Sequence, residues 1–277
     1  MTTIHPTADT YAYTLVNATE LPERERAKGI DISHYQEKYT PRPHHDFVIA
    51  KAVEITTENN KYKQHHDTVR GSGKVLGAYG YLRAGYDWRP QADALLEIAV
   101  AKNEADFLAT DFEKRGNYPS RKFAEDNLDY NTYLSDQSGK RVLEYSSPSV
   151  IQEWMFQYGV YWVRDYDDLW IAQWPYYGWN DRMLEVPFPD KGWNPRLPAG
   201  CTRWRFWQYS ADGNSRGSLE GVSSRDVDID VFNGTVEELW DWCNLKPEPP
   251  PPTPEPCGCC CEALRKVWNI VNDVVHD

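Results

Sequence analysis

The chain of 277 residues lacks the two segments that would mark a secreted or membrane-spanning protein. Residues 1–29 contain no basic region followed by an apolar one, so we expect no secretory signal peptide. No uncharged apolar stretch reaches about 20 residues, so no transmembrane segment is expected. These absences predict a protein that is made in the cytoplasm.

Basic residues are scarce as well. Lys and Arg number 30 against 42 Asp and Glu, which gives a formal net charge of −12 at pH 7. Nucleic acids are bound through their phosphates by a basic surface, which this composition does not supply. We therefore exclude nucleic acid as the main ligand.

Cysteine is almost absent from the body of the chain. Only Cys201 and Cys243 lie there, and the other four crowd into the segment CGCCC at 257–261. A fold that depends on disulfide bonds would distribute its cysteines along the chain. We therefore expect the core to be stable without disulfide bonds.

Aromatic residues, in contrast, are abundant. They make up 14% of the chain, with 12 Trp and 18 Tyr. Most such rings belong to the core of a protein. Flat rings also pack against the C–H faces of sugars, whose hydroxyl groups bind polar partners at the ring edge. The composition is therefore compatible with a carbohydrate-binding groove.

The pattern along the chain predicts four parts. Residues 1–28 are polar and without clear period, which indicates an N-terminal extension. Residues 29–245 have the length and pattern of one domain. The sequence KPEPPPPTPEP at 246–256 is a semi-rigid linker. Residues 257–277 form a Cys-rich tail with an amphipathic helix, which is too short to be stable alone.

Strand and helix patterns alternate over most of residues 29–245. Eight strands are predicted, at GIDIS, FVIAKAV, KVLGAYGYLRA, ADFLATDFE, 141–145, LWIAQW, TRWRFWQYS and DVDIDVF. The last two strands follow without an obvious intervening helix, and a helix TVEELWDWCN comes after them. This order predicts an α/β protein, an irregular TIM-like β/α barrel that is helix-poor in its last third.

Acidic residues lie near the ends of these strands, at Asp31, Asp111, Glu113 and Asp228. If the strands belong to one barrel, the carboxylates converge at one rim, where a glycosidic bond is usually cleaved. Asp111 and Glu113 are two residues apart and face the same side of their strand. Their repulsion raises one pKa, and we expect the glutamate to hold the proton and act as a general acid.

Two observations bear on how far these carboxylates indicate a site. The Asp111–Glu113 pair alone is equally compatible with salt bridges to Lys114 or Arg115. Asp228 and Asp230 alternate with aliphatic residues, so both aspartates face one side of their strand. An inward-facing acidic pair is costly unless a functional site uses it.

The motifs GIDISHYQ, FVIAKAVE, VLGAYGYLRAG, ATDFEK, LWIAQW, FWQYS and VDIDVFNG, in this order, resemble the glycoside hydrolase family 25 lysozymes. These are the Chalaropsis-type muramidases of bacteria, fungi and bacteriophages, and the resemblance covers about residues 29–245. It implies an irregular β/α barrel that hydrolyses the β-1,4 bond between N-acetylmuramic acid and N-acetylglucosamine in bacterial peptidoglycan. We expect neither a cofactor nor a metal ion.

The resemblance also implies roles for individual residues. Glu113 would protonate the leaving oxygen, and Asp111 would orient the N-acetyl group of the substrate or stabilise an oxocarbenium-like transition state. Asp31 and Asp228 would bind and orient the substrate. The motifs that line the groove contribute Tyr79, Tyr81, Trp170 and Gln208.

The chain departs from the family pattern at two positions. The family usually has a histidine or a bulkier residue where this chain has Gly80, and a glycine where this chain has Ile55. Neither departure removes a carboxylate. We expect both to affect the fine binding of substrate.

Two other functions are compatible with parts of the sequence. The pairs His44–His45 and His65–His66 suggest a zinc amidase, but adjacent histidines bind one metal less readily than an i, i+4 pair and no H-E-x-x-H motif is present. A non-catalytic glycan-binding module would explain the aromatic residues. It would not explain why Asp111 is paired with Glu113.

The tail and the missing signal peptide lead to two further expectations. The helix in residues 257–277 is predicted to self-associate or to dock on a partner. Without a signal peptide, an enzyme that degrades cell walls needs another route out of the cell. Release of a phage endolysin through a holin pore would provide this route and would indicate a phage or prophage origin.

Overall fold

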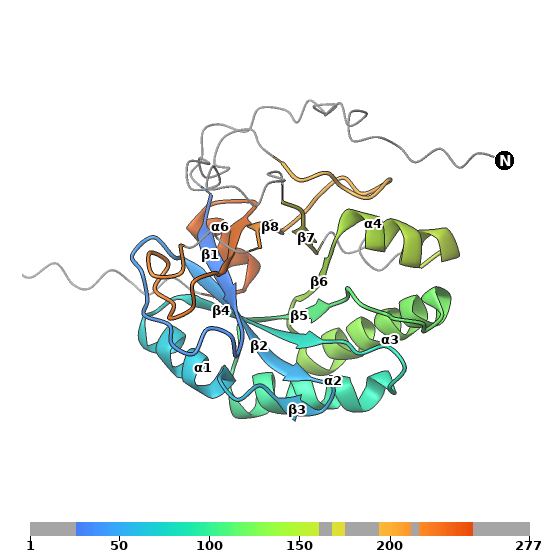
Figure 1. Ribbon diagram of the computed structural model, residues 1–277, viewed down its shortest axis with the longest axis horizontal. Helices are drawn as coiled ribbons and strands as arrows, with labels where there is room; N and C mark the ends of the chain where they lie inside the picture. The colour runs from blue at the N-terminus through green and yellow to red at the C-terminus, as the bar shows by residue number, and fades with distance from the viewer. Residues whose placement is uncertain (1–25, 161–167, 175–193, 212–215, 246–277) are drawn as a thin grey trace, which may run out of the picture. The chain divides into compact units, whose positions relative to one another are not determined.

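The computed structural model describes residues 26–160, 168–174, 194–211 and 216–245 (Figure 1). The chain divides into two compact units, residues 1–245 and 246–277, and all described residues belong to the first. Residues 1–25 of the predicted extension lie outside the described residues, as do the linker and the Cys-rich tail. In the part that is described, no helix is long and apolar enough to cross a membrane.

Eight strands form a closed barrel, which confirms the predicted fold class. In their order around the barrel they are β1 (Lys28–Ile32), β9 (Asp228–Phe232), β8 (Phe206–Ser210), β7 (Leu169–Ala172), β6 (Val142–Ser146), β5 (Phe107–Asp111), β4 (Val75–Tyr81) and β2 (Phe47–Glu54). Pairing between β1 and β2 closes the barrel. A ninth, two-residue strand β3 (Thr57–Glu58) forms a hairpin with β2, and the sequence pattern did not predict it.

The direction of β9 decides which of its residues reach the rim at the C-terminal ends of the parallel strands, called the upper rim below. The other seven barrel strands are parallel, whereas β9 runs antiparallel to both of its neighbours, β8 and β1. Its first residue, Asp228, therefore lies opposite Asp31, near the end of β1. In a parallel orientation Asp228 would lie at the opposite rim of the barrel.

Regular structure begins slightly earlier than predicted. Lys28 already pairs with Val231 of β9, and the backbone N–H of Ala27 donates to the carbonyl oxygen of Gly234 at 2.8 Å. The predicted boundary at residue 29 therefore cuts the first strand by one residue. Cys243 is a buried free thiol.

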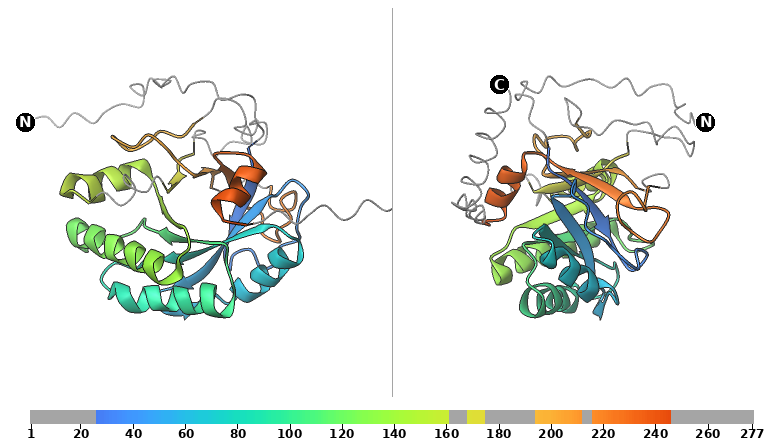
Figure 2. Two further views of the ribbon diagram at one scale, coloured as in Figure 1. Left: turned by 180° about the vertical axis from the view of Figure 1, so that it is seen from behind. Right: turned by 90° about the vertical axis from the view of Figure 1, so that its left-hand side faces the viewer.

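Helices cover the outside of the barrel (Figures 1 and 2). They are α1 (Tyr62–Gly71), α2 (Trp88–Leu96) with its π-helical continuation η2 (Glu97–Lys102), α3 (Ser120–Ser138), and the short segment made of α4 (Pro148–Val150), η3 (Ile151–Met155) and η4 (Phe156–Tyr158). Helices α1 and α2 pack on β2 and β4, and α3 packs on α2 and β6. The described residues between β7 and β9 contain no helix, which agrees with the helix-poor last third.

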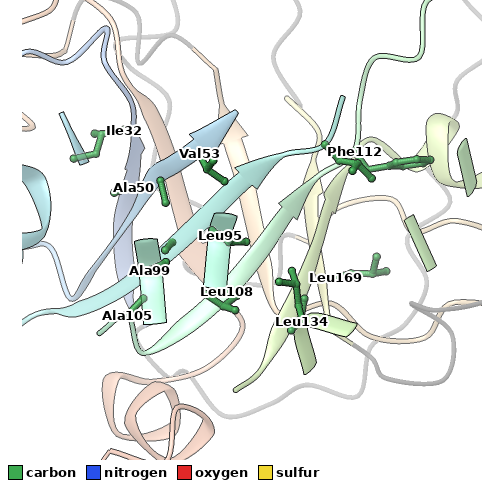
Figure 3. Close-up of a cluster of buried hydrophobic side chains, with 14 of the residues drawn as sticks. Ile32, Ala50, Val53, Leu95, Ala99, Ala105, Leu108, Phe112, Leu134 and Leu169 are labelled. Atoms are coloured by element: carbon green, nitrogen blue, oxygen red, sulfur yellow. The ribbon is translucent and has the colours of Figure 1, made fainter. Parts of the chain in front are cut away.

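The alternation of side chains along the strands gives the barrel an outer and an inner core. The outer core lies between the strands and the helices, where Leu108 of β5 meets Leu95 of α2 and Leu134 of α3 (Figure 3). The inner core contains Phe107 and Phe206, which pack against Trp242 of α6 (Val236–Trp242) at ring-centroid distances of 5.2 and 5.6 Å. Phenylalanines and α6 thus fill one end of the barrel and leave the other end to polar groups.

Gly80 faces the outer core. Its neighbours on β4, Tyr79 and Tyr81, point inward, so Gly80 points toward the helices. A Cβ atom at this position would lie 2.5 Å from the hydroxyl oxygen of Tyr130 on α3. The missing side chain at Gly80 therefore makes room for a helix residue, and the effect of this departure on substrate binding stays a prediction.

Ile55 lies in the two-residue turn between β2 and β3, with a φ angle of 55°. This left-handed conformation suits glycine, and it costs a residue with a Cβ atom about 1–2 kcal/mol. The strain is greater for a β-branched side chain. The departure at Ile55 therefore has a conformational cost in the turn.

Replacing Ile55 with Gly is expected to raise the free energy of unfolding by about 1 kcal/mol, since relief of the strained φ exceeds the added flexibility of the unfolded chain. Chemical denaturation measures this change. Ile55→Ala is the matched control, because it removes the side chain but keeps the Cβ atom. A gain as large in the alanine variant would show that φ is not the cause.

Candidate active site

Four carboxyl groups meet at the upper rim of the barrel. Asp31 and Asp228 are register partners on β1 and β9, and Asp111 is the last residue of β5. Glu113 follows two residues later, and its charge acts on both Asp31 and Asp111. The structure thus brings together the four acidic residues that the sequence singled out.

Asp111 is the buried member of its pair. Its side chain is 7% exposed, and Oδ1 has no hydrogen-bond partner among the described residues. Burial, and next the charge of Glu113, hold the pKa of Asp111 well above its ordinary value, while Lys51 opposes the shift. A raised pKa was expected on the glutamate of this pair, and the structure shows one on Asp111, which is removed from water.

Glu113 is accessible from solvent. Its side chain is 36% exposed, and it forms an ion pair with the Nζ atom of Lys114 at 3.7 Å. The guanidinium of Arg115 instead lies 5.2 Å from the ring centroid of Trp154 and donates to the carbonyl oxygen of Tyr118 at 3.0 Å. An exposed ion pair at this distance contributes little to stability. The salt-bridge alternative therefore does not account for Glu113.

Asp31 is oriented by Gln208 of β8. The Nε2 atom of Gln208 donates to Asp31 Oδ2 at 2.7 Å, and its Oε1 accepts from the hydroxyl of Tyr145 at 3.0 Å and from Nε1 of Trp174 at 3.1 Å. Burial raises the pKa of Asp31 to about 6, although the hydrogen bond from Gln208 opposes the shift. Gln208 is 2% exposed, so it orients Asp31 from inside the barrel and does not itself face solvent.

The aromatic residues predicted in the groove form the floor beneath the acids. Trp170 is 1% exposed, and its ring packs between Tyr145 and Tyr79 at centroid distances of 4.5 and 6.2 Å. Tyr81 is also buried, and its ring centroid lies 4.9 Å from Nζ of Lys51. These side chains fix the shape of the floor and expose little surface to a ligand.

The sequence analysis missed three residues of this site. Tyr145 and Trp174 donate to Gln208, and both lie in strands or motifs that the analysis had identified. Asp230 was recognised as inward-facing but received no role. It is fully buried, and its Oδ1 accepts from Nε1 of Trp170 at 2.7 Å. The inward alternation on β6 and β9 was the signal that could have found Tyr145 and Asp230, and its continuation two residues beyond β7 leads to Trp174.

The first histidine pair suggested as metal ligands, His44 and His45, lies in the loop before β2 rather than at the acidic rim. Nε2 of His44 and of His45 lie 2.7 and 2.9 Å from Oε2 of Glu220, and these three residues could hold a cation. Burial raises the pKa of Glu220, but hydrogen bonds from both histidines and the charge of Arg216 outweigh it and bring the pKa to about 2. Nη2 of Arg216 forms a salt bridge with Oε1 of Glu220 at 2.8 Å and neutralises its charge. The cluster therefore links two loops through ionic and hydrogen-bonding contacts.

The second histidine pair is also used in packing. His65 is fully buried, and its Nε2 lies 2.7 Å from the carbonyl oxygen of Gln36, within hydrogen-bonding distance. His66 contacts the neighbouring Asp67 at 2.9 Å. This arrangement does not direct the two rings toward one ligand.

Known proteins resemble both the sequence and the fold. Over 229 residues the chain is 26% identical to Lysozyme M1 of Streptomyces globisporus, covering 76% of this chain and 69% of the relative. It is 27% identical over 236 residues to the uncharacterized protein YegX of Escherichia coli K12, covering 80% of this chain and 75% of the relative. The bacterial lysozyme of Streptomyces coelicolor superimposes with a TM-score of 0.61 at 22% identity, over 79% of this chain and 97% of that structure. Residues 30–218 match the model of glycosyl hydrolases family 25, and the chain therefore belongs to this family.

Proposed function

We propose that this family 25 glycoside hydrolase is a lysozyme, which cleaves the β-1,4 bond between N-acetylmuramic acid and N-acetylglucosamine in bacterial peptidoglycan. The observation that carries the proposal is the convergence of Asp31, Asp111, Glu113 and Asp228 at one rim of the barrel. The similarity to Lysozyme M1 supports the choice of substrate.

In this reaction Glu113 delivers the proton to the leaving glycosidic oxygen. Its partial exposure allows contact with a substrate, whereas the buried Asp111 is in a better position to store a proton. The two carboxyls are electrostatically coupled, so the proton belongs to the pair. For cleavage the shared proton lies on Glu113, which passes it to the leaving oxygen, while the ionised carboxyl of Asp111 faces the N-acetyl group that assists in bond cleavage.

Asp31 and Asp228 bind and orient the sugar from the other side of the rim. Gln208 fixes the direction of the Asp31 carboxyl through the hydrogen bond at 2.7 Å. The rings of Tyr79, Tyr81 and Trp170 hold the floor rigid beneath the substrate. A rigid floor matters because a displacement of about 1 Å between reacting groups can reduce a rate about 100-fold.

Digestion of purified cell walls tests the proposed bond. Mass spectrometry of the reduced products is expected to show new reducing ends on N-acetylmuramic acid. New reducing ends on N-acetylglucosamine would contradict the proposed bond. Released peptides with intact glycan strands would indicate an amidase, and EDTA would then abolish activity; for a lysozyme we expect EDTA to have no effect.

A glycan-binding module without catalysis is the second candidate, because the aromatic content of the chain also suits a binder. Titration calorimetry with peptidoglycan fragments, run beside an assay for reducing sugars, separates the two functions. Binding accompanied by release of reducing sugar is expected. Binding without release over long incubation would favour the module.

We also propose that the enzyme is made in the cytoplasm and reaches the cell wall after release, as a phage endolysin does. Residues 1–29 are polar and lack the pattern of a basic region followed by an apolar one. N-terminal sequencing of the native protein is expected to find no processing by a signal peptidase. A cleaved leader would contradict this route.

A further inference from the structure

A fifth carboxyl group, that of Asp230, lies beneath the acidic rim without a complete set of partners. On β9 it is opposite Gln208 of β8 and Gly29 of β1, two residues further along the strand than Asp228. Its side chain is fully buried, and Oδ1 accepts the indole hydrogen of Trp170 at 2.7 Å. Oδ2 is buried too and has no hydrogen-bond donor among the described residues.

An ionised carboxylate in this position would be strongly destabilising. Burial of a charge costs several kcal/mol unless partners satisfy it, and among the described residues Asp230 has a single neutral donor. The carboxyl of Asp31 lies within hydrogen-bonding reach of Asp230. Two ionised carboxylates have only acceptor atoms, so such a contact is favourable only when one of them carries a proton.

The other groups around the pair favour a proton as well. The titratable side chains that face it are mostly acids and tyrosines, namely Asp228, Asp111, Glu113, Tyr79 and Tyr145, with the cation Lys51 beside Asp111. Burial, and next the charge of Asp31, raise the pKa of Asp230 well above its ordinary value. The direction of this shift agrees with the unpartnered oxygen.

We propose that Asp230 is a positioning residue that carries a proton and donates it in a hydrogen bond to Asp31, so that the two carboxyls together hold one negative charge. The donated hydrogen satisfies Oδ2 of Asp230, while Oδ1 keeps its bond to Trp170. Asp31 then receives hydrogen bonds from both Asp230 and Gln208. The consequence for catalysis, a carboxylate held in one direction at the rim, rests on the proposed function.

The pH dependence of folding tests for the proton without any assay of activity. A proton that the folded chain keeps and the unfolded chain releases makes the folding equilibrium constant fall tenfold per pH unit. We therefore compare the logarithm of the folding equilibrium constant, plotted against pH, between pH 6 and 8. The slope of this plot for Asp230→Asn is expected to be shallower than that of the wild type by one factor of ten per pH unit. Asp226→Asn removes an exposed carboxyl nearby and is expected to keep the wild-type slope.

The activity of two variants tests the positioning role. Asn keeps a donor beside Asp31, so Asp230→Asn is expected to retain kcat/KM within about threefold, whereas Asp230→Leu, which has no donor, loses at least about tenfold. Near-ultraviolet circular dichroism checks that the leucine variant is folded. An unchanged pH slope in Asp230→Asn would overturn the shared proton, and equal activity of the two variants would overturn the positioning role. A wild type without hydrolytic activity would contradict the proposed function alone, because the slope would still report the proton.

Discussion

Replacing Glu113 with Gln is expected to lower the rate of peptidoglycan hydrolysis by about 10²–10⁴-fold, since a general acid contributes a factor of this size. Gln has nearly the same shape but cannot give up a proton to the glycosidic oxygen. The stability should hardly change, because the side chain is 36% exposed and its ion pair with Lys114 is 3.7 Å long. Release of reducing sugar measures the rate, and thermal unfolding measures the stability.

Lys114→Met is the matched control for this variant. It removes the ionic partner of Glu113 and keeps the carboxyl, so at least about a third of the wild-type rate is expected to remain. If Glu113 served only as a partner for Lys114, the two variants would lose activity alike. A Glu113→Gln variant with wild-type activity would exclude Glu113 as the general acid.

The sequence predicted the strands of the barrel well because their inner and outer faces are both buried and their apolar runs are continuous. It also placed Asp31, Asp111 and Glu113 at one rim, since these residues lie at or near the ends of parallel strands or just beyond one. Asp228 was predicted at the same rim as well and lies there, but on an antiparallel strand that the pattern did not predict. Alternating residues face inward whichever way a strand runs, so only the pairing of β9 with β1 decides the rim at which Asp228 lies.

The sequence did not allow us to predict which carboxyl groups are buried by segments far away in the chain. Asp111 and Glu113 are equivalent in the pattern of their strand, yet the structure buries Asp111, which raises its pKa, and leaves the side chain of Glu113 36% exposed. The contact of Trp170 with Asp230 joins residues 60 positions apart in the chain. Such contacts determine the charge state of a carboxyl, and no local spacing encodes them.

Glu144 is a buried carboxyl that the sequence analysis did not notice, and it gives the second large expected effect. It lies on the outer face of β6 and is fully buried against α3. Its Oε2 accepts from the side-chain amides of Asn127 at 2.8 Å and Asn131 at 2.6 Å, while Oε1 has no partner among the described residues. Asn131 in turn bonds Thr110, which directly precedes Asp111 on β5.

Burial raises the pKa of Glu144 to about 8, and the two asparagine hydrogen bonds only partly oppose this shift. In the unfolded chain the group titrates near 4.5, so the folded protein binds the extra proton between about pH 4.5 and 8. The contribution of this proton to the free energy of unfolding is therefore complete below pH 4.5 and is lost as the pH rises toward 8. The loss over this window amounts to roughly 3–5 kcal/mol.

Glu144→Gln is expected to remove this part of the pH dependence. The amide oxygen of Gln can accept both asparagine hydrogen bonds, and its neutral side chain does not release a proton on unfolding. At pH 8 the variant should be more stable than the wild type by roughly 2–4 kcal/mol, because an unpartnered N–H group offsets part of the gain. Denaturant unfolding at intervals from pH 5 to pH 9 measures the difference.

Two further variants separate charge from packing. Glu125→Gln, on the exposed face of α3, is expected to change stability by less than about 0.5 kcal/mol at every pH. Glu144→Leu also lacks a charge but leaves both asparagine amides without their acceptor, so it should be less stable than Glu144→Gln throughout. A glutamine variant with the same pH profile as the wild type would show that Glu144 is ionised in the fold. The contacts that link α3 to Asp111 through Asn131 and Thr110 would then depend on a buried charge. Loss of an asparagine donor would in that case lower the free energy of unfolding far more than loss of the carboxyl.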